Sequence, residues 1–386
     1  MPVSDRPRVV PARAPVRRTS LGLPDGGFRA DVEGLRAVAV VAVVAFHLRL
    51  GGFAGGFVGV DVFFVVSGYL ITRLLLSEVG RTGRISLPAF WARRARRLLP
   101  ASALVLVVTV VASRWMLNPL AQRSVAADAL AAGGFVVNFV FANRLGDYFG
   151  AQLGALEPSP LLHVWSLAVE EQFYLLWPVT LLLLTRRPRQ YRRLVLAVVL
   201  GVAVASLVAS VWMTDHHPTW AFYLLPARMF ELLAGAAVAV AGGAFTTVNA
   251  MYRAALGWFG LAGILVAVGT YDASTPFPGT AALLPVLCTV LVLTAGGRGG
   301  AASGPVLVLG HPVAGWIGTR SYSIYLWHWP ALVLGQAKFG PLGLPSRVVV
   351  VAASVGLAAL TYRIVENPVR HHRWLAARPG RGLALG

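Results

Sequence analysis

Residues 36–47 read RAVAVVAVVAFH, an unbroken apolar run between an arginine and a histidine. Similar runs, each roughly 17–22 residues long, recur from about Leu35 to Val365, and each is long enough to cross a hydrocarbon core of about 30 Å. The sequence therefore predicts an all-α fold, a polytopic transmembrane helical bundle.

Composition supports a membrane protein. Hydrophobic residues make up 57% of the 386 residues and charged residues only 13%. A soluble domain carries about 25% charged residues, so a water-exposed surface would lack half of its usual charge. The first apolar run has no small-residue cleavage site and contains a charged residue, which argues against a signal peptide.

The apolar runs predict about ten spans plus one re-entrant or interfacial segment at about Val125–Phe141. We expect residues 1–28 to be a disordered basic cytoplasmic tail, 29–370 the membrane domain, and 371–386 a short cytoplasmic tail. The spans are expected to start near Leu35, Phe57, Leu98, Val164, Leu194, Phe222, Arg253, Thr280, Val313 and Arg347.

The net charge of +19 is concentrated in arginine clusters that alternate with weakly charged loops. Such alternation is the positive-inside pattern and places both termini in the cytoplasm. We attribute the charge to topology and to anionic lipid, and expect no nucleic-acid partner. Of the basic residues only Lys338 is a lysine, which is typical of a GC-rich bacterial genome. The sequence thus predicts a multi-pass protein of the bacterial inner membrane.

Charged groups within spans are costly and usually mark function. Arg36 and His47 are eleven residues apart, on one helix face about 16 Å apart. Histidine is suited to removing a proton from a hydroxyl near neutral pH. Two plainer interpretations remain, with Arg36 an interface anchor and His47 hydrogen-bonded between helices. Asp61 in the next span either orients His47 or caps the start of its helix.

A predicted cytoplasmic loop, residues 90–100, reads FWARRARRLLP. Arg93, Arg94 and Arg97 beside Trp91 are suited to clamping the phosphates of a nucleotide-like ligand, with a ring available for stacking. Anchoring by positive charge alone also explains a basic loop.

Residues 163–174 read HVWSLAVEEQFY, and the three-and-four spacing puts His163, Ser166, Glu170 and Tyr174 on one helix face. Glu170 and Glu171 are adjacent carboxylates in an apolar helix, either paired with Arg36 or Arg228 or shaping a polar substrate site.

Two further groups complete the candidate residues. Arg228 and Glu231, three apart on a later span, are spaced to pair with each other. Residues 321–330, SYSIYLWHWP, contain Tyr325 and His328; membrane-interface anchoring explains the tryptophans but not the histidine. We expect no metal site, since no cluster has ligand spacing, and an inert Cys288.

Taken together, these segments resemble acyltransferase family 3, the bacterial membrane O-acyltransferases. The arginine–histidine pair of residues 36–47, the stretch VDVFFVVSGYLIT at 60–72, the arginine segment 90–100, WSLAVEEQFY at 165–174, SYSIYLWHWP at 321–330 and YRIVENP at 362–368 occur in the order of the family motifs. Some members continue into an SGNH-type domain, and we expect a stand-alone membrane domain here.

The resemblance implies an acyl-CoA-dependent enzyme that acylates a hydroxyl of a carbohydrate, glycolipid or glycosylated natural product such as a macrolide. It implies a catalytic group of His47, Arg36, Asp61, Glu170 and Glu171, phosphate contacts from Arg36, Arg93, Arg94, Arg97 and Trp91, and supporting roles for Ser166, Tyr174, Arg228, Tyr325, His328 and Glu366. The alternative is a transporter or flippase that does not bind CoA.

Overall fold

The computed structural model describes residues 29–144, 158–186, 191–242, 248–296 and 304–384. Within these ranges the chain forms helices and no strand, which confirms the all-α prediction. The predicted tail 1–28 lies outside the described residues.

The α-helices are α1 (Ala30–His47), α2 (Gly59–Thr82), α3 (Leu87–Met116), α4 (Pro119–Gly133), α5 (Val137–Arg144), α7 (Trp165–Leu184), α8 (Tyr191–His216), α9 (Pro218–Tyr223), α10 (Leu225–Ala241), α11 (Ala250–Thr270), α12 (Leu283–Ala295), α13 (Val306–Leu309), α14 (Pro312–Phe339), α15 (Leu344–Thr361), α16 (Asn367–His371), α17 (Arg373–Ala377) and α18 (Pro379–Leu383). Short 3₁₀ turns precede α2 (Gly56–Val58) and α7 (Leu162–Val164), and a π-helical turn (Tyr362–Glu366) joins α15 to α16.

Among the described residues, seven helices are long and apolar enough to cross a membrane: α2, α3, α7, α8, α9–α10, α11 and α15–α16. The other three predicted spans correspond to α1, the shorter apolar α12, and α14. The chain is therefore a multi-pass, all-helical membrane protein. The stretch 125–141 is broken by Phe135, whose φ is +55°, and forms parts of α4 and α5, neither long enough to cross.

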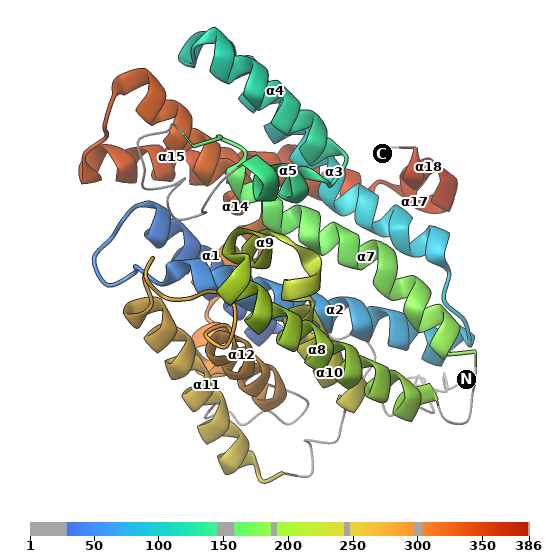
Figure 1. Cartoon of the computed structure of the whole chain (residues 1–386). Coiled ribbons are helices and arrows are strands. Elements are labelled where there is room, and N and C mark those ends of the chain that lie inside the picture. Colours follow the sequence, from blue (N-terminus) through green and yellow to red (C-terminus); the bar gives the residue numbers. More distant parts are fainter. Residues whose placement is uncertain (1–28, 145–157, 187–190, 243–247, 297–303, 385–386) are drawn as a thin grey trace, which may run out of the picture.

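Helices α2 and α10 lie at the centre of the bundle, and their backbones cross closely (Figure 1). A Cβ at Gly68 would lie 1.7 Å from the carbonyl oxygen of Leu232, and one at Gly235 would lie 1.8 Å from that of Val65. Only glycine permits this approach, as is common where membrane helices pack. Around this pair lie α1 with α14, α11 with α12, and the outer α8 and α15.

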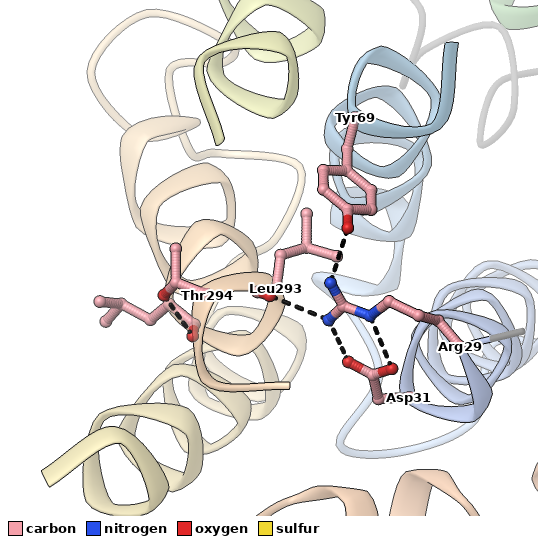
Figure 2. A network of polar contacts seen from close by, with 6 residues as sticks. Arg29, Asp31, Tyr69, Leu293 and Thr294 are labelled. Atoms are coloured by element: carbon pink, nitrogen blue, oxygen red, sulfur yellow. Dashed lines mark hydrogen bonds and ion pairs between the residues drawn. The ribbon is translucent and has the colours of Figure 1, made fainter. Parts of the chain in front are cut away.

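The start of α1 is fixed to two other helices by Arg29 (Figure 2). Its guanidinium binds the Asp31 carboxylate, donates to the Tyr69 hydroxyl on α2 at 2.7 Å, and donates to the Leu293 carbonyl on α12 at 2.9 Å. Four of the five N–H donors of this partly buried guanidinium gain partners in this way, which sets the position of α1 relative to α2 and α12.

The predicted loop at residues 90–100 is wrong, because this segment is the first half of α3. Pro88 lies in the first turn, where no N–H partner is lost, and Ala, Arg and Leu are strong helix formers. Pro100 lies inside the helix, and the nearby Leu98 carbonyl accepts hydrogen bonds from Ser102 at 3.0 Å and from Tyr322 at 3.0 Å. The run of basic residues indicates sidedness and does not imply a loop.

Three short helices, α16, α17 and α18, form most of the C-terminal segment up to Leu383. Helix α18 packs against α3, and a Cβ at Gly382 would lie 3.0 Å from that of Ala92. Arg96 donates to the Leu375 carbonyl at 3.1 Å. The predicted short tail therefore covers part of the arginine-rich half of α3.

Candidate active site

An open cavity lies between α1, α2, α3, α7 and α14, and its empty space, which includes open solvent, is about 700 Å³. Its polar lining residues are Arg36, Ser67, Arg94, Arg97, Ser166, Glu170, Tyr174, Ser321, Tyr322 and Tyr325. Apolar side chains of α2, α3 and α7 complete its wall, so the cavity has both a basic and an apolar lining. Ligand sites commonly combine these two properties.

Arg94 and Arg97 are three residues apart on α3, so the helix directs both toward the cavity. The Arg94 guanidinium lies over the rings of Tyr174 and Phe90, with its carbon 5.5 Å and 5.8 Å from the ring centroids. In the part of the chain that the structure describes, neither guanidinium forms an ion pair with a carboxylate. Both retain donors for an anionic ligand.

The other two predicted phosphate contacts of α3 are directed elsewhere. Arg93 does not line the cavity and forms an ion pair with Glu78 at 2.8 Å. Trp91 donates its indole N–H to the Tyr174 carbonyl at 3.1 Å and ties α3 to α7. Adjacent Arg93 and Arg94 point about 100° apart on the helix, so Arg93 reaches Glu78 whereas Arg94 faces the cavity.

Two of the predicted catalytic residues, Arg36 on α1 and Glu170 on α7, face the cavity. Arg36 forms an ion pair with Glu33, one turn earlier, at 2.8 Å. Glu170 accepts a hydrogen bond from Ser67 on α2, so its carboxylate is directed toward α2. Neither structural partner considered for Glu170, Arg36 or Arg228, forms an ion pair with it among the described residues. Glu171 is not among the lining residues.

His47, the last residue of α1, is 9% exposed and does not line the cavity. Its Nδ1 lies 2.9 Å from Nε2 of His328 on α14, and its ring packs against Trp329 with centroids 4.5 Å apart. Nδ1 of His328 lies 2.7 Å from the Tyr325 carbonyl oxygen. The structure thus brings together two predicted residues that are 281 positions apart.

Tyr325 joins the histidine pair to the cavity. Its ring centroid is 5.5 Å from that of His328, and its hydroxyl is 2.8 Å from the Ser166 hydroxyl, with both Tyr325 and Ser166 lining the cavity. The Tyr325 hydroxyl donates to the His163 carbonyl at 2.9 Å. The His163 ring packs against Tyr325 and His328, and among the described residues its two nitrogens have no hydrogen-bond partner.

Asp61 does not orient His47 as one sequence hypothesis had it. Its carboxylate lies 3.2 Å from the Arg228 guanidinium, which also lies 3.1 Å from Glu231, as the spacing of that pair predicted. The Arg228 guanidinium is enclosed by the rings of four aromatic residues at 5.2–5.8 Å: Phe64, Trp165, Phe222 and Phe277. This cluster links α2 to α10 and does not line the cavity, apart from Phe64.

Glu366 also lies away from the cavity lining, and its carboxylate accepts from Ser323 at 2.7 Å, which joins α14 to the π-helical turn. Sequence reasoning missed three polar cavity residues, Ser67, Ser321 and Tyr322, which lay within recognised motifs but were not selected. It placed His163 on the correct helix face without assigning it to the site. The three-residue spacing between His163 and Ser166 could have indicated that His163 lies close to the site.

Comparison with known proteins agrees with these observations. The acyltransferase 3 family model, described as an acyltransferase domain, matches residues 29–363. The chain is 35% identical over 360 residues to the peptidoglycan O-acetyltransferase OatA of Listeria monocytogenes, covering 89% of this chain and 56% of that protein. It is 33% identical over 356 residues to the putative peptidoglycan O-acetyltransferase YrhL of Bacillus subtilis, covering 88% and 54%.

A third relative, the O-acetyltransferase OatA of Staphylococcus aureus, is 31% identical over 350 residues, with coverage of 88% and 57%. The chain thus spans a little over half the length of these curated relatives. No solved structure gives a significant match.

Proposed function

From the premise that this chain belongs to the acyltransferase 3 family, we propose that it transfers an acetyl or other short acyl group from acyl-CoA to a hydroxyl of a cell-envelope glycan. The single observation that carries the proposal is the cavity between α1, α3 and α14, in which the Arg94 and Arg97 guanidiniums lack carboxylate partners among the described residues.

Arginine supports the choice of a phosphorylated donor. A guanidinium binds phosphate oxygens through paired, charge-assisted hydrogen bonds, and CoA carries several phosphate groups. Arg94 is held by two rings and Arg36 by Glu33, so these side chains are already positioned before a ligand arrives. The positive-inside pattern of the sequence would place this end of the cavity on the cytoplasmic side, where acyl-CoA is available.

The size of the site is compatible with the donor. Arg36 lies in the second turn of α1 and His47 is its last residue, and eleven residues of helix span about 16 Å. An extended pantetheine arm is of this order, so a thioester could reach the Tyr325–His328–His47 region while its phosphates stay on the arginines. Apolar side chains of α2 and α7 would line its path.

His47 is the proposed base. An imidazole nitrogen of His47 would take the proton of the acceptor hydroxyl, whose oxygen then forms a bond to the thioester carbonyl carbon. The C–S bond breaks, and the CoA thiolate takes the proton back from the imidazolium. A transient acyl-imidazole on His47 is the other route, with the acyl group passing to the acceptor in a second step.

The acceptor class rests on the relatives, two of whose names specify peptidoglycan. We therefore place a peptidoglycan-type glycan first and a glycolipid or a glycosylated natural product such as a macrolide after it. Localisation in the bacterial inner membrane with both termini cytoplasmic is part of the same proposal.

The test is CoA release by the purified protein in detergent, with acetyl-CoA and a panel of peptidoglycan fragments, other glycans and macrolides. Acceptor-dependent release is expected, together with an acetyl ester on the acceptor by mass spectrometry. His47→Ala should lose at least about 100-fold in kcat. Arg94→Ala/Arg97→Ala should raise the acyl-CoA KM by about 100-fold or more, as expected when two charge-assisted hydrogen bonds of about tenfold each are removed.

The matched control is Arg81→Ala/Arg84→Ala, which removes the same charge from exposed positions in the last turn of α2 and in the segment that follows it. Its acyl-CoA KM should equal that of the wild type. Wild-type activity in His47→Ala would remove the histidine from the mechanism. If the wild-type protein neither bound nor consumed acyl-CoA, the transferase proposal itself would be wrong.

A further inference from the structure

The bonding of His328 determines which nitrogen of His47 carries a proton. His328 is fully buried on α14, and its Nδ1 lies 2.7 Å from the Tyr325 carbonyl oxygen and 3.2 Å from that of Ile324. A carbonyl oxygen only accepts hydrogen bonds, so Nδ1 of His328 must carry a hydrogen.

The other nitrogen of His328 faces His47. Nε2 of His328 and Nδ1 of His47 are 2.9 Å apart, a hydrogen bond in which one nitrogen donates and the other accepts. If Nε2 of His328 also carried a hydrogen, His328 would be a buried cation. No carboxylate of the described residues hydrogen bonds to His328, and the groups packed on it are His47, His163 and Tyr325. A buried cation without an anionic partner is costly, so Nε2 accepts.

We infer that His328 is a positioning residue which fixes His47 in the tautomer with its proton on Nδ1, so that the lone pair on Nε2 is the one that takes the substrate's proton. The two hydrogen bonds of His328 begin at the backbone of α14, since the Tyr325 carbonyl belongs to the helical turn that precedes His328. Trp329, the next residue of α14, packs on the His47 ring and restricts its rotation.

The hydrogen bond between His47 and His328 also changes in strength during the proposed reaction. When Nε2 of His47 gains a proton, the Nδ1–H of the new imidazolium donates to His328, and a hydrogen bond from a charged donor is stronger than the neutral one. The interaction thus strengthens as the proton moves from the acceptor oxygen to His47, and weakens when the proton passes to the CoA thiolate. His328 itself neither gains nor loses a proton.

The kinetic part of this inference rests on the proposed function, whereas the tautomer does not. The first measurement is therefore spectroscopic. Protein with ¹⁵N-labelled histidine is purified in detergent, and the ring signals of His47 are assigned by comparison with His47→Gln. The expected result is a protonated Nδ1 and an unprotonated Nε2 in the wild type. A proton on Nε2 instead would overturn the inference, whatever the activity.

The second measurement compares two substitutions at His328. His328→Leu removes the acceptor, and kcat is expected to fall about 100-fold with the acyl-CoA dissociation constant unchanged. His328→Gln keeps an oxygen able to accept from Nδ1–H and is expected to recover at least a tenth of the wild-type kcat. Equal kcat in the Leu and Gln variants, or a Leu variant close to the wild type, would contradict a positioning role.

The matched control is His216→Leu. His216 is an exposed helical histidine whose Nδ1 bonds to the Trp212 carbonyl four residues earlier, so this variant loses the same local hydrogen bond. Its kcat should be unchanged. If the His328→Leu protein fails to fold, the Gln variant and the wild-type spectrum still decide the matter. A wild type with the expected tautomer but no acyl-CoA turnover would leave the tautomer standing and reject the transferase proposal.

Discussion

Asp61 on α2 and Arg228 on α10 lie 3.2 Å apart, with neither side chain more than 1% exposed. Arg228 also pairs with Glu231, so one guanidinium holds two buried carboxylates at the centre of the bundle. We expect Arg228→Met to lower the free energy of unfolding by about 3–5 kcal/mol, because it leaves buried carboxylates without a positive partner. Equilibrium unfolding in detergent measures this loss.

A neutral version of the same cluster provides the control. The triple variant Arg228→Met/Asp61→Asn/Glu231→Gln contains no buried charge and should recover most of the lost stability, since the desolvation penalty disappears with the charges. If the single and triple variants were equally unstable, packing of Arg228 among its four aromatic neighbours, and not charge, would account for the loss.

The crossing of α2 and α10 predicts a second effect on stability. Gly235→Ala places a methyl group 1.8 Å from the Val65 carbonyl oxygen, so the helices must separate, at an expected cost of at least about 2 kcal/mol. Gly201→Ala on α8 is the matched change. Its new methyl group meets nothing within 4 Å, and the helix gains up to about 1 kcal/mol from the better helix former. If Gly235→Ala and Gly201→Ala changed the free energy of unfolding equally, α2 and α10 would not cross closely at Gly235.

The helical form of the arginine segment predicts different roles for adjacent arginines. Arg93→Ala should leave the acyl-CoA KM within about twofold of the wild type, because Arg93 pairs with Glu78 and faces away from the cavity. Arg94→Ala should raise KM by about tenfold, the loss expected for a charge-assisted hydrogen bond. Steady-state kinetics with varied acyl-CoA measures both. Similar KM values in the two variants would indicate that the arginines act as an undirected basic surface.

The sequence contained what was needed for the helices and for residues close together in the chain. Hydrophobic runs determine helix number, and the eleven-residue spacing places Arg36 and His47 on the same helix, as observed. Arg228 and Glu231 could be paired for the same reason, since three residues along a helix are neighbours. The arginine segment was misread because charge sets sidedness, whereas Ala, Arg and Leu set helicity.

Long-range partners could not be predicted in this way. His47 and His328 are 281 residues apart, and Asp61 and Arg228 are 167 apart. Spacing within one helix says nothing about which helices become neighbours. Asp61 was therefore considered as a partner of His47, although the packing of α2 on α10 brings its carboxylate to Arg228. Only three-dimensional packing, here set by contacts such as the Gly68–Gly235 crossing, decides these pairs.

The position of Arg94 over two rings predicts that an aromatic face, and not a hydroxyl, prepares the donor site. Tyr174→Leu removes the nearer ring, 5.5 Å from the guanidinium carbon, and should raise the acyl-CoA KM by about 2- to 30-fold, as expected for a cation–π contact of about 0.5–2 kcal/mol. Tyr174→Phe keeps the ring and should leave KM unchanged. The backbone carbonyl that accepts from Trp91 is present in both variants, so the link between α3 and α7 is maintained. A raised KM in Tyr174→Phe equal to that in Tyr174→Leu would assign the effect to the hydroxyl, which would then bind the ligand directly.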